Sequence, residues 1–333
     1  MTASAPDRAA PRKIILDCDP GIDDALAIAF ACGHPGLELL GLTTVGGNVD
    51  LAKTTANALA VRDFAGCPEV PVVAGSPVPL LRSVLDARHV HGESGLGAAS
   101  LPAARSGARD GHAVDYLVRA IGAAAGEITL VATGPLTNIA LAVRREPRLV
   151  TQVRDFVIMG GSAGRGNVTP AAEFNIAADP EAAAIVFGAG WTVTMVGLDV
   201  TYLARATAAV QERMRGLGRL GVSLLLPALS GYRHETAAAL GRAPGAADGP
   251  AVHDVCALAL VAAPGLFGCL PARVEVETAG RWTTGMTVTD FTAPEDERNA
   301  LVAMSMDVPG FWDLVLDAYA RTAAARSPAR SPA

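Results

Sequence analysis

Short apolar runs alternate with longer amphipathic stretches along the first part of the chain. The run Ile14-Ile15-Leu16 predicts a buried strand and the stretch Ala25 to Phe30 a helix, with Pro20-Gly21 as the turn between them. The same pattern predicts strand, helix, strand, helix and strand over 13–18, 23–32, 37–45, 50–65 and 70–74. Strands that alternate with helices are typical of a parallel sheet with helices on both faces.

The alternation continues through the middle of the chain and changes near the C-terminus. Further strands are predicted at 128–132, 156–159 and 192–198. Further helices are predicted at 112–124, 137–145 and 254–263, with another that starts at Asp179 and others within 207–240. Alternating apolar positions from Ala272 to Asp290 predict an antiparallel hairpin at the sheet edge, before a last helix near 309–321. The predicted fold class is α/β: an open, mostly parallel Rossmann-like sheet with helices on both faces and an antiparallel extension near the C-terminus. We expect one domain over 13–322, with disordered tails at 1–12 and 323–333.

Composition narrows the class of protein. Half of the 333 residues are apolar and 18% are charged, which argues against a disordered chain. The net charge is −6 without a long basic run, so nucleic acid is not an expected partner. The five cysteines form no CxxC pair, which favours reduced thiols and a cytoplasmic location. Glycine or proline interrupts the two long uncharged stretches, 182–198 and 255–272, so no membrane span is expected.

Four carboxylates lie within eight residues at the first predicted turn: Asp17, Asp19, Asp23 and Asp24. The first two share one face of the strand end, and the last two lie where the helix starts. Four anions this close at the edge of an apolar core repel one another unless a cation joins them. Helix capping explains one or two of them. The octet 17–24 therefore predicts metal or catalytic chemistry.

Other polar residues recur at the predicted carboxyl ends of the strands, where parallel sheets bind ligands. A calcium ion takes roughly six to eight oxygen ligands, and Asp19, Asp24, Asp254 and the Thr133 carbonyl could supply some of them. Asp254 could equally cap its helix. No Cys/His cluster has zinc spacing, so calcium or magnesium is favoured over zinc.

Several polar side chains in glycine-rich loops could bind the hydroxyls of a sugar, although each by itself could merely shape a turn. They are Asn48, Asn167, Glu173 and Asn175. His91 lies in the long irregular stretch 80–110, where it could reach a substrate or only be solvated. His253, next to Asp254, is the better candidate for proton transfer.

Together these motifs resemble those of the nucleoside hydrolases, in the inosine-uridine-preferring and pyrimidine-preferring branches. The resemblance runs from Lys13 to about Ala320. Its most specific parts are the octet 17–24, His89-Val90-His91-Gly92-Glu93-Ser94-Gly95, Thr133 to Asn138, Ala172 to Asn175 and Val252 to Asp254. The family's fold is an open α/β sheet, and its members are usually dimers or tetramers, so a homodimer or homotetramer is expected.

The resemblance implies hydrolysis of the N-glycosidic bond of ribonucleosides to ribose and free base, with a tightly held Ca²⁺ ion. Carried over by motif, the calcium ligands would be Asp19, Asp24, the Thr133 carbonyl and Asp254, and Asp19 would also act as general base on a metal-bound water. The ribose would be bound by Asp23, Asn48, Met159, Asn167, Glu173 and Asn175. His253 and His91 would face the base, and Asp17 is expected to support the loop or take an outer hydrogen bond.

Base preference and two other functions stay open. Purine-competent members tend to place tyrosines before the His-Asp motif, but here no aromatic residue lies between Tyr232 and His253. The loop at 80–100 has no tryptophan, which argues against the purine-specific branch, because that branch stacks the base between tryptophans. A strand followed by Asp-x-Asp is also typical of haloacid-dehalogenase-like phosphatases, but Pro20 to Asp24 does not fit their usual continuation. The non-enzymatic alternative is a ribose- or nucleoside-binding protein without turnover, against which the complete acidic set argues.

Overall fold

A nine-stranded sheet forms the centre of the computed structural model, which describes residues 10–232 and 249–325. The strand order is β3-β2-β1-β4-β5-β6-β9-β7-β8. The strands from β3 to β9 in this order pair in parallel, and the last two pairings are antiparallel. The bounds are β1 Arg12–Cys18, β2 Leu37–Thr44, β3 Val72–Ala74, β4 Ile128–Ala132, β5 Asp155–Met159, β6 Val193–Val196, β7 Phe267–Val276, β8 Thr287–Asp290 and β9 Ala300–Met306.

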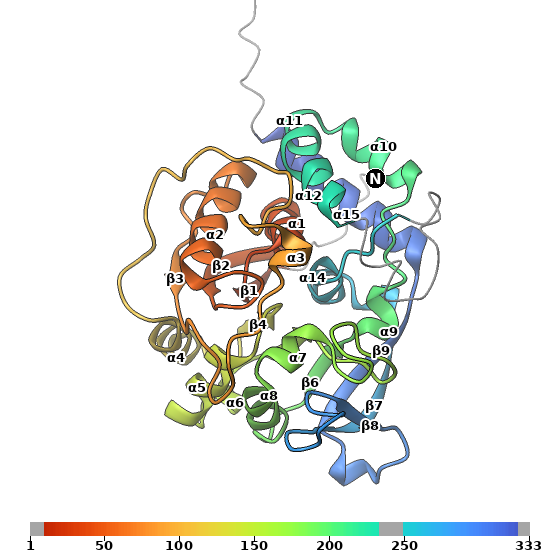
Figure 1. Ribbon diagram of the computed structural model, residues 1–333. Helices are drawn as coiled ribbons and strands as arrows, with labels where there is room; N and C mark the ends of the chain where they lie inside the picture. The colour runs from red at the N-terminus through yellow and green to blue at the C-terminus, as the bar shows by residue number, and fades with distance from the viewer. Residues whose placement is uncertain (1–9, 233–248, 326–333) are drawn as a thin grey trace, which may run out of the picture.

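Helices cover both faces of the sheet, and alternate residues of each strand contact them. In β1, Ile14, Leu16 and Cys18 pack into one core and Ile15 into the other, because successive side chains of a strand point to opposite faces. The first core is covered by α1 Ile22–Gly33, α2 Leu51–Ala65, α14 Asp254–Ala262 and α15 Val308–Ala324. The second is covered by α4 Ala113–Ala123, α5 Thr137–Arg145, α6 Leu149–Gln152 and α8 Pro180–Phe187. Figure 1 shows α1, α14 and α15 on the upper right side of the sheet and α4, α5 and α8 on its lower left side.

The remaining helical segments are short. Those beyond the carboxyl ends of the strands are α3 Arg88–His91, α7 Phe174–Ala178 and α9 Leu198–Thr201. A further group leads to the end of the first described range: α10 Ala208–Arg215, α11 Gly218–Leu220, a π-helical turn at Gly221–Leu225 and α12 Leu226–Gly231. Two 3₁₀ turns lie at Pro264–Leu266 and Glu295–Glu297. No helix within the described residues is both long and apolar enough to cross a membrane.

The predicted fold class is confirmed, including the antiparallel extension, but the extension is attached differently. The hairpin of β7 and β8 joins the sheet through β9, a strand that the sequence pattern did not predict, which pairs with β6 on one side and β7 on the other. The apolar run in β9 is short and directly precedes α15, so local pattern alone did not separate it from the helix.

Some predicted bounds also differ from the structure. Leu198, expected to end a strand, begins α9, and Phe174, expected in a loop, begins α7. Regular secondary structure within the described residues begins with β1 at Arg12 and ends with α15 at Ala324. Residues 1–9 and 326–333 of the predicted tails, and residues 233–248, lie outside the described residues.

Candidate functional site

The acidic octet lies between β1 and α1, at the carboxyl edge of the sheet. The strand ends at Cys18 and the helix begins at Ile22, so the turn between them is short. Asp19 and Asp24 are fully buried. Oδ2 of Asp24 accepts a hydrogen bond from the Gly21 N–H at 3.0 Å, which closes the first turn of the helix. Asp24 is therefore a helix cap as well as a candidate ligand.

Asp19 is enclosed by backbone from two neighbouring strand ends. Its Oδ2 accepts a hydrogen bond from the Asn48 N–H at 2.7 Å, beyond the end of β2. A Cβ atom at Gly47 would lie 2.1 Å from Oδ2, and one at Gly134 would lie 2.7 Å from Oδ1. Both positions need glycine because the backbone approaches the carboxylate so closely. Oδ1 of Asp19 is buried and has no hydrogen-bond partner within the described residues.

Thr133 and Asn175 connect the octet to the ends of β4 and β5. Thr133 Oγ1 donates to Oδ1 of Asp24 at 2.9 Å. The Asn175 side-chain amide donates to the carbonyl of Thr133 at 2.9 Å and to that of Met159 at 3.0 Å. A carbonyl oxygen has two lone pairs, so the Thr133 carbonyl retains capacity for another partner. Asp254, at the start of α14, is buried beside these groups.

The carboxylates of this cluster are not neutralised by neighbouring side chains. Burial first, and then the Asp24 charge, raise the pKa of Asp19 and of Asp254 well above the usual range, and raise that of Asp23 to about 7. Within residues 10–232 and 249–325, no ion pair involves any of these carboxylates. Buried anions without a counter-ion are costly. An orphaned Oδ1 on Asp19 and a second one on Asp23 therefore fit a bound cation and a polar ligand.

The side chains do not form a complete metal site by themselves. No group of three His, Cys, Asp or Glu side chains in the described part of the chain converges as a ready ligand set. A hard cation here would therefore need backbone carbonyl and water oxygens in addition to Asp19, Asp24 and Asp254.

A cavity of about 200 Å³ opens above this cluster. Most of the side chains predicted from the sequence to contact substrate line it, whereas Asp19 and Asp24 lie buried beneath. The predicted residues in its wall are Asp23, Asn48, His91, Thr133, Met159, Asn167, Glu173, Asn175, His253 and Asp254. Segments far apart in the chain thus meet at one sheet edge, as expected for a parallel α/β sheet.

Hydrogen bonds at the start of α7 shape one wall of the cavity. Glu173 is the N-cap of α7 and accepts hydrogen bonds from the backbone N–H groups of Gly161, Asn175 and Ile176. Burial raises its pKa to about 7 against these donors. Asn167 is exposed, and its Oδ1 accepts from the Phe174 N–H at 2.9 Å. Asn167 therefore holds the start of α7 as well as lining the cavity.

Two buried histidines face the cavity from opposite elements. His91 Nδ1 accepts a hydrogen bond from the Ile22 N–H at 3.0 Å, so the ring proton of the neutral imidazole is on Nε2. His253 Nδ1 lies 2.7 Å from Thr201 Oγ1. Burial lowers the pKa of His91 to about 3 and that of His253 to about 4. Both rings are therefore neutral at physiological pH.

Two tyrosines complete the wall around His253. The Tyr232 hydroxyl donates to Oδ2 of Asp23 at 3.2 Å, and the Tyr202 ring meets the His253 ring edge-on, with 5.4 Å between centroids. Sequence reasoning did not single out Tyr202. It follows β6 closely, so the rule that ligands bind beyond the strand ends was the available signal.

Asp17, which was expected to support the loop or take an outer hydrogen bond, is buried and bonded to neighbouring elements. Its Oδ1 accepts hydrogen bonds from Thr43 Oγ1 at 2.5 Å and from the Asn138 amide at 2.9 Å. Asn138 Oδ1 in turn accepts from the Ser76 N–H at 2.9 Å. Asp17 therefore ties β1 to its neighbours beneath the cavity and does not line it.

Known proteins share this fold and align with nearly the whole of this chain. The family model described as inosine-uridine preferring nucleoside hydrolase matches residues 14–313. An inosine-uridine preferring nucleoside hydrolase from Leishmania major is 48% identical over 320 residues, which cover 93% of this chain and 98% of the relative. A pyrimidine-specific ribonucleoside hydrolase from Salmonella paratyphi C is 41% identical, with 91% and 97% covered.

A solved structure agrees with these relatives. The purine-preferring ribonucleoside hydrolase from Gardnerella vaginalis superposes with a TM-score of 0.86 at 34% identity, over 94% of this chain and 99% of that one. Because the family model and the relatives extend over nearly the whole chain, the chain belongs to the inosine-uridine preferring nucleoside hydrolase family and is an N-glycosyl hydrolase.

Proposed function

We propose that this nucleoside hydrolase cleaves the N-glycosidic bond of ribonucleosides to ribose and free base in a calcium-dependent reaction. The observation that carries the proposal is the cavity floor. Buried carboxylates that form no ion pair with any described residue lie there. The cavity wall above them contains polar side chains that can bind the hydroxyls of a sugar, and two neutral histidines. Cleavage of such a bond passes through an oxocarbenium-like sugar, which nearby carboxylates stabilise.

Asp19, Asp24, Asp254 and the Thr133 carbonyl would hold the calcium ion. Calcium, when bound, neutralises these carboxylates and lowers the pKa of a coordinated water. Asp19 is the general base of the proposal, because its Oδ1 is orphaned while Oδ2 is fixed by the Asn48 N–H. A base whose second oxygen is held in place keeps the first one aimed at the proton that it accepts.

The ribose is bound by the polar residues of the wall. Asp23 is suited to hold a ribose hydroxyl, because its Oδ2 is occupied by Tyr232 and the His253 N–H while Oδ1 is orphaned. A hydroxyl that donates to Oδ1 would satisfy that buried oxygen. The other proposed sugar contacts are Asn48, Met159, Asn167, Glu173 and Asn175.

The departing base leaves as an anion unless it receives a proton, and hydrogen bonds from the site stabilise that anion as it forms. His91 presents Nε2–H toward the cavity, since its Nδ1 is occupied by the Ile22 N–H. His253 lies opposite, with Nδ1 directed to Thr201. We assign both neutral rings to the base as hydrogen-bond donors, His91 through Nε2–H and His253 through Nε2–H with its Nδ1 accepting from the Thr201 hydroxyl.

Base preference, assembly and location are further parts of the proposal. Relatives of similar identity are named as inosine-uridine preferring, pyrimidine-specific and purine-preferring, so overall similarity does not select the base. We propose a homodimer or homotetramer, which sedimentation equilibrium would measure. The described cysteines form no disulfide, in keeping with a reducing, cytoplasmic location.

Release of reducing sugar from inosine, uridine, cytidine and adenosine tests the proposal, with calcium and with a chelator. We expect turnover of at least one nucleoside, loss of turnover in the chelator and recovery on adding calcium. Asp19→Ala should bind nucleoside but lower kcat by about a hundredfold or more, since general-base catalysis contributes roughly that much. Full activity in excess chelator, or in Asp19→Ala, would contradict the mechanism. Binding of nucleosides by the wild-type protein without any turnover would indicate a nucleoside-binding protein instead of an enzyme.

A further inference from the structure

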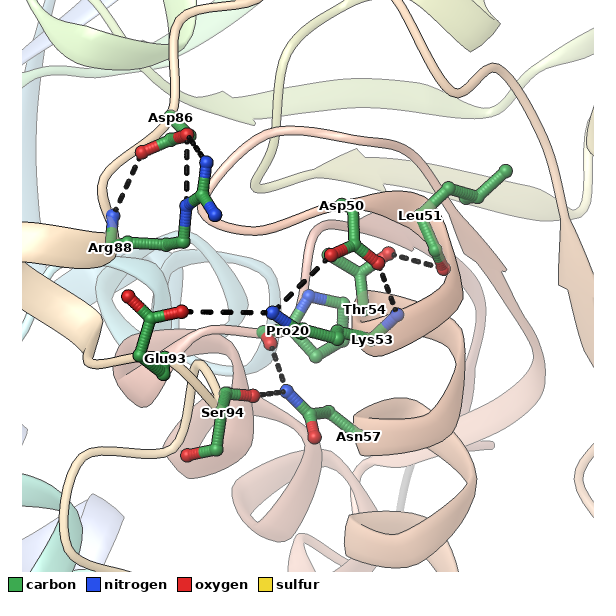
Figure 2. Close-up of polar contacts among 10 residues, drawn as sticks. All are labelled: Pro20, Asp50, Leu51, Lys53, Thr54, Asn57, Asp86, Arg88, Glu93 and Ser94. Atoms are coloured by element: carbon green, nitrogen blue, oxygen red, sulfur yellow. Dashed lines mark hydrogen bonds and ion pairs between the residues drawn. The ribbon is translucent and has the colours of Figure 1, made fainter.

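Asn57 joins two parts of the site that are distant in the sequence. It lies on α2, faces away from solvent, and donates both hydrogens of its side-chain amide to backbone carbonyls. One bond goes to Pro20 in the acidic turn, at 3.0 Å, and the other to Ser94, at 2.8 Å. Figure 2 shows the Asn57 amide between these two carbonyls. A primary amide nitrogen has two donors, so this bridge uses its full capacity.

The Ser94 carbonyl belongs to a loop that carries one of the proposed base contacts. We call residues 87–97 the His91 loop. It crosses the acidic turn at His91, whose ring accepts from the Ile22 N–H, and a few residues later at Asn57. Its ends are tied elsewhere, through the Ala87 N–H to the Asn48 carbonyl and through the Ala98 N–H to the Pro227 carbonyl. Asn57 therefore anchors the segment between His91 and the end of the loop.

The backbone at Gly95 is shaped to admit this amide. Gly95 has φ +87°, in the left-handed region. A Cβ atom at this position would lie 2.8 Å from Asn57 Nδ2 and 3.3 Å from the Pro20 carbonyl oxygen. Glycine thus removes both a backbone strain and a steric conflict at the point where loop, turn and helix meet.

A second link between α2 and the loop is of a different kind. Lys53 Nζ lies 3.4 Å from Asp50 and 4.0 Å from Glu93, and all three side chains are exposed. Figure 2 shows Lys53 between these two carboxylates. Exposed pairs of this length contribute little. Lys53 therefore provides a matched control that contacts the same loop from the same helix.

We propose that Asn57 is a positioning residue, which holds the His91 loop against the acidic turn so that His91 Nε2–H stays directed at the departing base. The inference rests on the proposed function for the role of His91. It goes beyond that function, because Asn57 does not line the cavity. Loss of the amide would leave the buried Pro20 carbonyl unpaired and release the Ser94 carbonyl, whose bond is partly buried, so that the loop could move away from the turn.

A double-mutant cycle tests the proposal. Asn57→Ala should lower kcat/KM by about tenfold or more, because small misplacements of groups at a reacting centre have effects of that size. Lys53→Ala should change it by less than about twofold. In a His91→Ala background, Asn57→Ala should have little further effect. Equal losses in both backgrounds would show a general structural role and overturn the proposal, as would an unchanged kcat/KM in the single variant.

A second variant covers the case in which Asn57→Ala does not fold. Gly95→Ala displaces the amide from the loop side, and it should show the same loss of kcat/KM and the same dependence on His91. Amide hydrogen exchange adds a readout that needs no turnover: exchange in 87–97 should be faster in Asn57→Ala than in wild type and unchanged in Lys53→Ala. Unchanged exchange refutes the tether. If the wild-type protein hydrolyses no nucleoside, the proposed function is refuted. If amide exchange in 87–97 is nevertheless faster in Asn57→Ala, the role of Asn57 in holding the His91 loop is still supported.

Discussion

Residues with the same side chain take different roles at this site because their neighbours differ. Asp17 and Asp19 are two positions apart, and each has one buried oxygen without a partner among the described residues. The satisfied oxygen of Asp17 accepts from the side chains of Thr43 and Asn138, whereas that of Asp19 accepts from the Asn48 backbone N–H. The sequence showed a crowded set of acids, and a strand-end position for both. It did not show which oxygens are satisfied, because the donors Thr43 and Asn138 come from β2 and from the start of α5.

Thr201 is a residue whose role follows from one contact. Its hydroxyl lies 2.7 Å from His253 Nδ1, and both side chains are buried. This bond orients the imidazole and leaves Nε2 as the ring nitrogen not engaged by Thr201. Thr201 has no feature in the sequence that distinguishes it from a core threonine.

Thr201→Val should lower kcat by about tenfold with a small change in KM, because the ring loses a buried hydrogen bond of roughly 1–3 kcal/mol that holds its orientation. Steady-state kinetics on the best nucleoside substrate measures this, with Thr201→Ser as the control that retains the hydroxyl. Equal activity of the valine and serine variants would show that the contact does not orient His253.

At the scale of elements, the turns and short helices beyond the strand ends form the site, and the strands position them. The short helix α7 is an example. Its N-cap, Glu173, is also in the cavity wall, so capping and substrate contact depend on the same carboxylate. The motif predicted Glu173 for the sugar, whereas its hydrogen bond from the Gly161 N–H joins it to a loop that only the folded chain brings near.

The raised pKa of Glu173 gives α7 a measurable pH dependence. The ordinary pKa of a glutamate is 4.5, and burial raises that of Glu173 to about 7. A raised pKa means that the contribution of this carboxyl to stability is present below pH 4.5 and is lost as pH rises through 7. Glu173→Gln removes the titration, so the Tm of wild type relative to this variant should fall between about pH 5 and pH 8. Thermal unfolding in chelator measures the difference, and a pH-independent one would contradict the raised pKa.

At the scale of the whole molecule, two apolar cores on either side of one sheet hold the acidic cluster at the sheet edge. Asp19, Asp24 and Asp254 come from two helix starts and a strand end, so their repulsion acts between elements that pack together. Without a bound cation, the repulsion among these carboxylates therefore lowers the stability of the folded chain.

Calcium should raise the Tm of the whole chain by several degrees relative to chelator, because a ligand that binds only the folded state stabilises it. Differential scanning calorimetry measures the shift at several calcium concentrations. In Asp19→Ala the shift should shrink, since a ligand is gone. A Tm insensitive to calcium would contradict the assignment of Asp19, Asp24 and Asp254.

Local patterns determined much of this protein. The runs that form β1, β4, α1 and α5 depend on neighbouring residues, and so their bounds were predictable within a residue or two. The acidic octet indicated its chemistry for the same reason, since four carboxylates in eight residues repel whatever the fold. The later motifs, through their resemblance to those of the nucleoside hydrolases, then gave the prediction of the remaining site residues.

Tertiary structure decided what depends on partners far along the chain. It placed β9 between β6 and β7, buried His91 against the Ile22 N–H, and brought Tyr202 to His253. It also set Asn57 between Pro20 and Ser94, each 37 positions away along the chain. Such contacts arise because parallel strands bring all of their carboxyl ends to one edge, and no local pattern records which side chains meet there.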